Sequence, residues 1–509
     1  MASFNSSALL FLLFRATIFT VVVGDTFQVD FHHRFSDKVR QWAESQGLPA
    51  LWHPKKAPKG SVEYFKELIR HDRALFSRHD RLLAATDVYN FAASNETINF
   101  PSLGFLHYAS VTVGTPNQTF LVALTTGSDL FWLPCNCKMC APLTSPSYGD
   151  LEFSTYSTNA SSTSKTISCG SSQCNLLNNQ GGNCTGMSSN CSYAINYSIV
   201  NTSSSGFLVE DVLYLGKGST GTDIIQTPIV FGCGEFQTGA FLGTVAPNGL
   251  MGLGIANVSV PTMLARKGLI TDSFSMCFSI DGSGRLNFGD EGSSDQSETP
   301  LTIDKNLPHY NISIEGMVIG NITTKTSFTA LVNAGAAFTI LANQVYKELT
   351  NIFTAQVTET QISDPTLPFE YCYQLSSGQT EVSFPEVNFT TKGGSQFPVL
   401  NPIVILISEK NQRPVGYCLA VQPSNSKNII GNNFLTGLRV VFNREKKVLG
   451  WKPFDCYSTE SSTIHPIDKN ASAPSPASKA PPPIHPETTQ LPRTKSSAPD
   501  LSHFLSIEL

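Results

Sequence analysis

The chain has 509 residues, a charged fraction of 14% and a formal net charge of −5. Because single globular domains usually hold about 100–200 residues, this length predicts two large lobes with appended segments. The low charged fraction, together with 37 Gly, 30 Pro and 33 Phe, is unlike a long helical bundle or coiled coil and favours a β-rich protein. The slightly acidic balance offers no strong basic surface, so we expect no nucleic-acid partner.

The first segment of the chain has the composition of a secretory signal. Residues Ala8–Val23 are apolar apart from Arg15 and a few hydroxyl side chains, and the small residue Gly24 follows them. An apolar signal core spans about 7–15 residues, whereas a membrane-spanning helix needs about 20. We therefore expect residues 1–24 to be a signal peptide, with a retained anchor as the alternative, and no transmembrane segment after its removal. The implied location is the secretory pathway and then the extracellular space or cell wall, with the vacuole as an alternative.

The next segment, residues 25–100, contains a run with helical spacing of apolar residues, Val62–Ala85. Within this run the sequence Arg-His-Asp-Arg occurs at residues 70–73 and again at residues 78–81, about two helical turns later. Two interpretations remain open. The basic clusters are either a solvated helix face or part of a removable prosegment that covers an acidic cleft.

From Phe105 to Trp451 the chain consists of short β-rich runs separated by Gly, Asn, Pro and Ser. The clearest helical candidates are a short run near residue 260 and a longer one that starts at Asn343. These patterns predict an all-β fold with a few short helices. Residues 458–509 are rich in Pro, Ser and Thr and are typical of a disordered tail.

Twelve cysteines fit the oxidising compartment that a signal peptide implies. They are Cys135, Cys137, Cys140, Cys169, Cys174, Cys184, Cys191, Cys233, Cys277, Cys372, Cys418 and Cys456. A zinc site at the first three is an alternative, but no histidine is interleaved with them, and we expect no metal. Seven cysteines precede residue 200 and five follow it, so complete pairing requires at least one disulfide between the two groups.

Asn-x-Ser/Thr triplets suit the same compartment because they are acceptors for N-glycosylation. They begin at Asn95, Asn117, Asn159, Asn183, Asn190, Asn196, Asn201, Asn257, Asn311, Asn321, Asn388 and Asn470. Their number favours a secreted glycoprotein without identifying which sites carry a glycan.

A weak internal duplication connects the two halves of the β-rich region. In the first half, Leu121–Ser128 is followed much later by Asn248–Gly254. In the second half, Thr329–Ala337 is followed by Asn428–Asn432. Each pair combines an apolar strand and a Gly-containing turn with a later apolar-apolar-Gly segment, so the matching order indicates two related lobes.

The β-rich region resembles the pepsin-like aspartic peptidases, and in particular the plant nepenthesin-like or aspartyl protease group. The resemblance is carried by His107-Tyr108, Val111–Pro116, Ala123–Cys135, Phe231–Gly234, Asn248–Gly254, Asp272–Phe278, Ile429–Phe434 and Val448–Trp451. It implies a bilobal double β-barrel with a central cleft, to which each lobe contributes one catalytic aspartate. On this basis we assign residues 101–290 to an N-terminal lobe and residues 291–457 to a C-terminal lobe, preceded by the prosegment-like residues 25–100.

Neither catalytic aspartate of this family is present in the chain. The family places each one first in an Asp-Thr/Ser-Gly motif, and the corresponding residues here are Thr125, followed by Thr126-Gly127, and Asn333, followed by Ala334-Gly335. Two close carboxylates that share a proton activate water in these enzymes, and neither a hydroxyl nor an amide titrates in the required range. The aspartate at position 129 is expected in the family in addition to the catalytic one, so it is not a replacement. The sequence therefore predicts an inactive catalytic centre.

The resemblance also implies binding residues and disulfides. It assigns peptide binding to Tyr197, as the tyrosine of a flap over the cleft, and to Gly127, Ser128 and Gly335; ordinary packing is the alternative for Tyr197. It further implies disulfides between Cys372 and Cys418 and between Cys233 and Cys456.

The favoured function is a secreted, non-catalytic pseudopeptidase that binds an extended peptide or a protein between its lobes. A secreted inhibitor of glycoside hydrolases on the same fold, with a secreted glycosidase as partner, is one alternative. A residually active aspartic endopeptidase is the other. We expect a monomer with no cofactor.

Overall fold

The computed structural model describes the backbone of residues 27–33, residue 65, and residues 107–456 apart from short gaps. The gaps are 144–152, 181–183, 185, 198–201, 218–222, 244–245, 281–282, 304–308, 365–366, 368, 377–378, 380–381, 409–412 and 455. The expected signal peptide, the tail at 458–509 and nearly all of the expected helix at Val62–Ala85 lie outside the described residues.

The first half of the molecule is built from long, mostly antiparallel strands. They are β2 (His107–Val113), β3 (Gln118–Thr125), β4 (Trp132–Met139), β5 (Lys165–Thr166), β6 (Ser192–Asn196), β7 (Ser203–Lys217), β8 (Asp223–Thr238), β9 (Leu250–Gly252), β10 (Ser273–Phe278) and β11 (Ser283–Phe288). Strands β7 and β8 form the longest antiparallel ladder, while β3 runs parallel to β9 and β4 runs parallel to β8. The short helix α3 (Val260–Arg266) starts with proline near its N-terminus, and the 3₁₀ segments are η2 (Ser172–Gln180) and η3 (Gly239–Leu242).

The second half has shorter strands. They are β12 (Ser297–Thr302), β13 (Asn311–Ile319), β14 (Ile322–Thr323), β15 (Phe328–Val332), β16 (Thr339–Ala342), β17 (Thr360–Ile362), β18 (Cys372–Gln374), β19 (Val387–Thr391), β20 (Gln396–Val399), β21 (Ile403–Ile407), β22 (Pro414–Leu419), β23 (Val421–Ser424), β24 (Ile429–Ile430), β25 (Leu438–Asn443) and β26 (Val448–Pro453). Its helices are α4 (Asn343–Thr354) and α5 (Asn432–Leu435). Helices α3 and α4 confirm the two helical candidates of the sequence.

Side-chain alternation explains these strands. In β13 the buried residues Ile312 and Ile314 alternate with Asn311, Ser313 and Glu315, as expected for a strand with one covered face. The alternation then shifts by one residue at an irregularity between Ile314 and Gly316 in its pairing with β19. The strands of both halves and their pairing confirm the predicted all-β, double-barrel fold.

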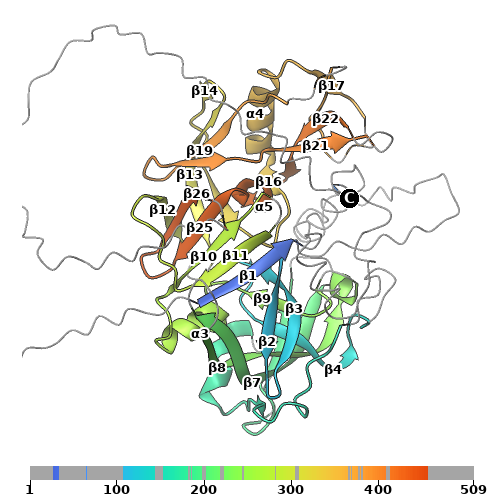
Figure 1. Ribbon diagram of the computed structural model, residues 1–509, viewed down its shortest axis with the longest axis vertical. Helices are drawn as coiled ribbons and strands as arrows, with labels where there is room; N and C mark the ends of the chain where they lie inside the picture. Colours follow the sequence, from blue (N-terminus) through green and yellow to red (C-terminus); the bar gives the residue numbers. More distant parts are fainter. Residues whose placement is uncertain are drawn as a thin grey trace, which may run out of the picture.

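A group of strands lies between the two halves (Figure 1). Strand β10 pairs with both β11 and β25, β25 pairs with β26, and β26 pairs with β12. Strand β1 (Phe27–His33) pairs with β11 on one side and with β2 and β7 on the other. A segment near the start of the chain is therefore a strand inside the sheet. The sequence reasoning did not predict this strand, although Phe27, Val29 and Phe31 alternate with polar residues.

All twelve cysteines are paired, and the structure both confirms and corrects the expected disulfides. The bonds join Cys135–Cys233, Cys137–Cys140, Cys169–Cys184, Cys174–Cys191, Cys277–Cys456 and Cys372–Cys418. The bond between Cys372 and Cys418 is confirmed, because these residues face each other across β18 and β22. The bond from residue 135 to residue 233 joins the group of seven cysteines before residue 200 to the group of five after it, as two odd-numbered groups require.

The predicted bond between Cys233 and Cys456 is wrong. Cys233 lies on β8, which runs parallel to β4, and this places its Cα atom 4.9 Å from that of Cys135. Cys456 follows β26, whose neighbour β25 pairs with β10, so the C-terminal cysteine arrives 5.6 Å (Cα–Cα) from Cys277 on β10.

Candidate functional site

The first catalytic position of the family lies at the end of a buried strand. Thr125 is the last residue of β3, which is hydrogen-bonded to β2 on one side and to β9 on the other. The backbone N–H of Leu253 donates to the carbonyl oxygen of Thr125 over 2.9 Å. Asn248 holds the same strand, because its side-chain oxygen accepts a 2.9 Å hydrogen bond from the N–H of Leu121. The loop that starts at Thr125 is thus fixed by β9 and the residues beside it.

The second position has the same construction in the other half. Asn333 follows β15, which pairs antiparallel with β13 and parallel with β24. Its backbone N–H donates to Ile430 over 3.0 Å. Asn428 holds this second strand. Its backbone carbonyl accepts a 3.0 Å hydrogen bond from the N–H of Leu331, whereas Asn248 acts through its side chain. The four pieces of the sequence duplication therefore occupy equivalent positions, with a parallel strand pair in each half.

The two loops meet at their side chains. The Thr125 hydroxyl (Oγ1) donates to the Asn333 side-chain oxygen (Oδ1) over 3.2 Å. The N–H of Gly127 donates to the same hydroxyl over 3.1 Å, and the N–H of Gly335 donates to the Asn333 oxygen over 2.8 Å. Both side chains are buried. The structure thus brings Thr125 and Asn333 together, with Gly127 and Gly335 as their backbone donors, and no carboxylate takes part in the contact.

The second residues of the two motifs are not equivalent. The Thr126 hydroxyl donates to the Val332 carbonyl over 2.9 Å and accepts from the N–H of Ala334 over 3.0 Å. Ala334 has no hydroxyl with which to form the reciprocal bridge. Its carbonyl oxygen instead accepts a 2.9 Å hydrogen bond from the Asn432 amide, which also contacts Nδ1 of His107 at 3.0 Å. Sequence reasoning did not assign a role to Asn432, although it ends the repeated Ile-Ile-Gly-Asn segment.

The orientation of the Asn333 amide follows from its partners. A backbone N–H and a hydroxyl both point at Oδ1, so that atom must be the acceptor and the NH₂ group must face elsewhere. Within the described part of the chain, this NH₂ group donates to no partner. A Cβ atom placed on Gly127 would lie 2.7 Å from the amide nitrogen, so the missing side chain of Gly127 leaves space beside it. The hydroxyl of Ser128 is also buried without a partner among the described residues.

The flap candidate Tyr197 lies directly after β6, in the β6–β7 hairpin. Its phenol oxygen accepts a 2.9 Å hydrogen bond from the indole N–H of Trp132, and its ring packs edge-on against Phe241 at a centroid distance of 4.8 Å. Burial raises the pKa of the Tyr197 phenol, while the hydrogen bond from Trp132 acts to lower this pKa. Tyr197 is therefore a neutral hydroxyl that connects the hairpin to the start of β4, close to the loop that follows Thr125.

Asp129 and His107 do not face the contact between the two loops. One carboxylate oxygen of Asp129 accepts a 2.9 Å hydrogen bond from the backbone N–H of Ala256. A Cβ atom on Gly254 would lie 2.3 Å from that oxygen, so the carboxylate is pressed against the β9–α3 connection. His107 contacts Asn432 and the ring of Phe278. Both side chains have partners of their own in the described structure.

One further cluster has the composition of a metal site. The sulfur atoms of Cys169, Cys174 and Cys184 lie within 4.8 Å of one another. Each of them is already bonded to another sulfur, in the disulfides Cys169–Cys184 and Cys174–Cys191, and a disulfide sulfur is a poor metal ligand compared with a thiolate. The cluster is two neighbouring disulfides. Among the described helices, none is long and apolar enough to cross a membrane.

The chain is similar to two family models and to several plant proteins. The models are described as the N-terminal part of a xylanase inhibitor, over residues 107–290, and its C-terminal part, over residues 309–453. The chain is 43% identical to Aspartyl protease family protein 1 of Arabidopsis thaliana over 95% of its own length and 92% of the relative. It is 36% identical to Aspartic proteinase-like protein 1 of the same plant, over 93% and 89% of the two chains.

Solved structures show the same fold at low identity. Basic 7S globulin from soybean matches with a TM-score of 0.54 at 21% identity, over 69% of this chain and 93% of the globulin chain. Conglutin gamma from lupine seeds matches with a TM-score of 0.53 at 20% identity, over 69% and 92% of the two chains. The relatives named above, together with the paired loops at Thr125 and Asn333, show that the chain belongs to the pepsin-like aspartic protease family of plants.

Proposed function

We propose that this protein is a non-catalytic member of its family that binds an extended peptide or protein segment where its two halves meet. The observation that carries the proposal is the hydrogen bond from Thr125 Oγ1 to Asn333 Oδ1. In an active aspartic peptidase one catalytic carboxylate removes a proton from water and the other donates one, because the two close carboxylates share a single proton. A threonine hydroxyl and an asparagine amide do neither between about pH 2 and 7.

The same contact supports a binding role. The NH₂ group of Asn333 is a donor without a partner among the described residues, and Gly127 leaves space beside it. This nitrogen is not among the fully buried polar atoms without a partner, so it can be solvated, and a carbonyl oxygen of a bound peptide backbone would replace water as its acceptor. A protonated carboxyl group offers a similar donor only at acid pH. The amide keeps its hydrogens at every accessible pH, so we expect binding that does not change between about pH 4 and 7.

Proteolysis is the first test. The purified protein, exposed to acid so that any prosegment can leave, should cleave no denatured protein substrate between about pH 2 and 7. Cleavage that pepstatin inhibits would refute the proposal and would support the alternative of a residually active aspartic endopeptidase.

Restoring both carboxylates is the sharper test. The double variant Thr125→Asp/Asn333→Asp should gain acid proteolysis, because the backbone donors at Gly127 and Gly335 are already in place. Each single variant is the matched control and should stay inactive, since one carboxylate cannot share a proton. If the double variant gains nothing, Ala334 and Ala336 become the first candidates for the missing supports.

Peptide binding has its own experiment. A pool of octapeptides passed over the immobilised protein should be retained equally at pH 4 and pH 7. The variant Gly127→Ala should lose this retention, because its Cβ atom occupies the space beside the Asn333 amide. Equal retention by both proteins would move the binding site away from this amide.

An inhibitor of secreted glycoside hydrolases remains a second candidate. It is supported by the two matched family models, which are described as parts of a xylanase inhibitor. The test is direct: the purified protein is titrated against a xylanase, and a stoichiometric loss of xylanase activity would favour this function over peptide binding.

We also propose that the protein is a secreted, monomeric glycoprotein. The apolar segment after the start of the chain supports secretion, and the exposure of several glycosylation acceptors supports modification; the exposed asparagines are Asn117, Asn159, Asn190, Asn196 and Asn321. N-terminal sequencing of protein purified from plant extracellular fluid would test removal of residues 1–24. Mass loss on treatment with an amidase specific for N-glycans would test glycosylation, and light scattering would test the monomer.

A further inference from the structure

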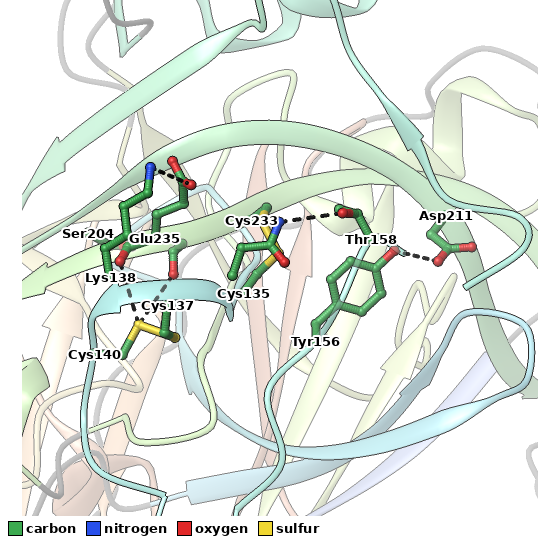
Figure 2. The surroundings of a disulfide bond; sticks show 12 residues. Cys135, Cys137, Lys138, Cys140, Tyr156, Thr158, Ser204, Asp211, Cys233 and Glu235 are labelled. Carbon is green, nitrogen blue, oxygen red and sulfur yellow. Dashed lines mark hydrogen bonds and ion pairs between the residues drawn. A yellow bond between two sulfur atoms is a disulfide. The ribbon is translucent and has the colours of Figure 1, made fainter. Parts of the chain in front are cut away.

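One disulfide combines partial exposure with a span shorter than that of any other. Strand β4 ends with Cys137-Lys138-Met139, and a disulfide joins Cys137 to Cys140, the residue after the strand (Figure 2). Residue 137 is exposed and residue 140 is half-buried. By contrast, Cys135 and Cys233, which form the neighbouring bond, are both 0% exposed. A dissolved thiolate can therefore reach the Cys137–Cys140 bond but not its neighbour.

The short span makes this bond dispensable for folding. Its cysteines are only three positions apart, whereas the two bonds to Cys233 and Cys456 join residues 98 and 179 positions apart. A cross-link lowers the conformational entropy of the unfolded chain less when it closes a shorter loop. Of the six disulfides, this bond therefore stabilises the fold the least through unfolded-chain entropy. Opening it should leave the fold intact.

Other contacts would keep the end of β4 in place after the bond opens. The Lys138 ammonium lies 3.0 Å from the Glu235 carboxylate and 5.3 Å from the centre of the Phe236 ring (Figure 2). Met139 pairs with Phe236 between β4 and β8, and the N–H of Ala141 donates to the side chain of Gln237 over 3.0 Å. Two thiols held near each other in this way can form their disulfide again.

The surroundings of Cys140 also favour the reduced state. Its sulfur lies 3.6 Å from the carbonyl oxygen of Gly234 and 3.7 Å from that of Glu235. A disulfide sulfur has no hydrogen to donate to these oxygens, but a thiol has one. The reduced form therefore gains a weak hydrogen bond that the oxidised form lacks, and stabilising the reduced form makes a disulfide a stronger oxidant.

We propose that Cys137–Cys140 is a reversible thiol–disulfide exchange site whose partner is a dithiol, such as the reduced form of a dithiol oxidoreductase. A thiolate of the dithiol attacks the exposed sulfur of Cys137 and forms a mixed disulfide, while Cys140 leaves with the electron pair and takes up a proton. The second thiol of the partner then loses its proton to solvent and attacks the partner's sulfur atom in the mixed disulfide. The thiolate of Cys137 leaves and takes up a proton from solvent. Two electrons pass to this protein, and the partner becomes oxidised.

Redox titration of the full chain tests the proposal, with dithiothreitol as the dithiol probe. Protein equilibrated at graded ratios of reduced to oxidised dithiothreitol is quenched in acid, and free thiols are alkylated and located by mass spectrometry. We expect Cys137 and Cys140 to be half reduced at a ratio at least tenfold lower than any other pair, a difference of about 30 mV. The Cys169–Cys184 bond is the internal comparison, because it is also partly exposed but joins residues 15 positions apart.

A matched variant completes the test. The double variant Cys137→Ser/Cys140→Ser should unfold at the same urea concentration as the oxidised protein, within error, and should lose the first reduction step while keeping the later ones. The proposal is overturned if another pair is reduced first or if all six are reduced together. It is also overturned if the protein unfolds as the Cys137–Cys140 pair opens.

Discussion

The hydroxyl of Thr126 is the clearest single link between the two halves at the candidate site. It donates to the Val332 carbonyl over 2.9 Å and accepts from the Ala334 N–H over 3.0 Å, so it satisfies one acceptor and one donor of the opposite loop. The variant Thr126→Val keeps the shape of the side chain and removes only this hydroxyl. Both backbone groups are then left buried without their partner.

The expected cost follows from those two groups. A buried donor or acceptor without a partner costs about 1–3 kcal/mol, and a hydrophobic methyl group in place of the hydroxyl regains part of this loss. We expect Thr126→Val to lower the free energy of unfolding by about 2–4 kcal/mol. The control variant Thr126→Ser keeps the hydroxyl and removes only a methyl group, so its loss should be about 1 kcal/mol or less.

Urea unfolding monitored by tryptophan fluorescence measures both variants under the same conditions. If Thr126→Val lowers the free energy of unfolding no more than Thr126→Ser does, the Thr126 hydroxyl does not hold the two loops together. Hydrogen exchange gives an independent readout, because the amide of Ala334 should lose protection in the valine variant only.

Three further predictions concern buried groups and one glycine in the first half of the molecule. Tyr197→Phe keeps the ring but removes the acceptor of the buried Trp132 N–H, so it should cost about 1–3 kcal/mol in urea unfolding; no loss would mean that the indole has another acceptor. Burial acts to raise the pKa of Asp211, but hydrogen bonds from three hydroxyls and a backbone N–H outweigh it and hold this pKa below its usual range. The stability that Asp211 contributes is therefore present above its unfolded pKa of about 3.9 and is lost as pH falls through the lower folded pKa. When the free energy of unfolding is measured against pH, Asp211→Asn should show a smaller loss of stability in acid than the parent protein. Gly249→Ala should cost about 2–4 kcal/mol, since Gly249 has φ of 104° and its Cβ would lie 2.3 Å from a backbone oxygen; Gly393→Ala, with φ of 97° and open space, should lose clearly less.

The sequence predicted the parts of the fold that depend on local pattern and on duplication. Strand alternation predicted the all-β class, and the repeated segments predicted that Thr125 and Asn333 occupy equivalent positions. The bond between Cys372 and Cys418 was predicted because the resemblance covers that part of the second half. These features follow from motifs that lie within one stretch of chain or repeat in a fixed order.

Features that depend on three-dimensional neighbours could not be predicted in the same way. The partner of Cys233 is set by the parallel pairing of β4 and β8, which no local pattern encodes. The place of β1 in the sheet depends on strands about 75 to 260 residues further along the chain. The free NH₂ group of Asn333 is visible only when the donors of Gly335 and Thr125 are placed around its oxygen.

The loss of both carboxylates should also change how the stability of the site depends on pH. The backbone bonds that hold Thr125 and Asn333, from Leu253 and to Ile430, use no side-chain charge, so the loops can keep their geometry with or without a dyad. Two full negative charges at the observed 3.2 Å separation would repel each other by about 5 kcal/mol at an effective dielectric constant near 20. The variant Thr125→Asp/Asn333→Asp avoids this repulsion only by keeping one proton, which raises the folded pKa of one carboxyl group above its unfolded value of about 4.

This raised pKa fixes the sign of the effect. Between the unfolded and the folded pKa the folded double variant binds more protons than its unfolded chain, so its stability must fall as pH rises through that interval. The parent protein has no titrating group at either position and should show no such fall there. Urea unfolding of both proteins from about pH 3 to 8 should therefore give a stability difference that widens with pH by a few kcal/mol and then levels off. If the difference in free energy of unfolding between the two proteins stays constant with pH, the two introduced carboxylates do not share a proton. In that case the double variant should not gain acid proteolysis either.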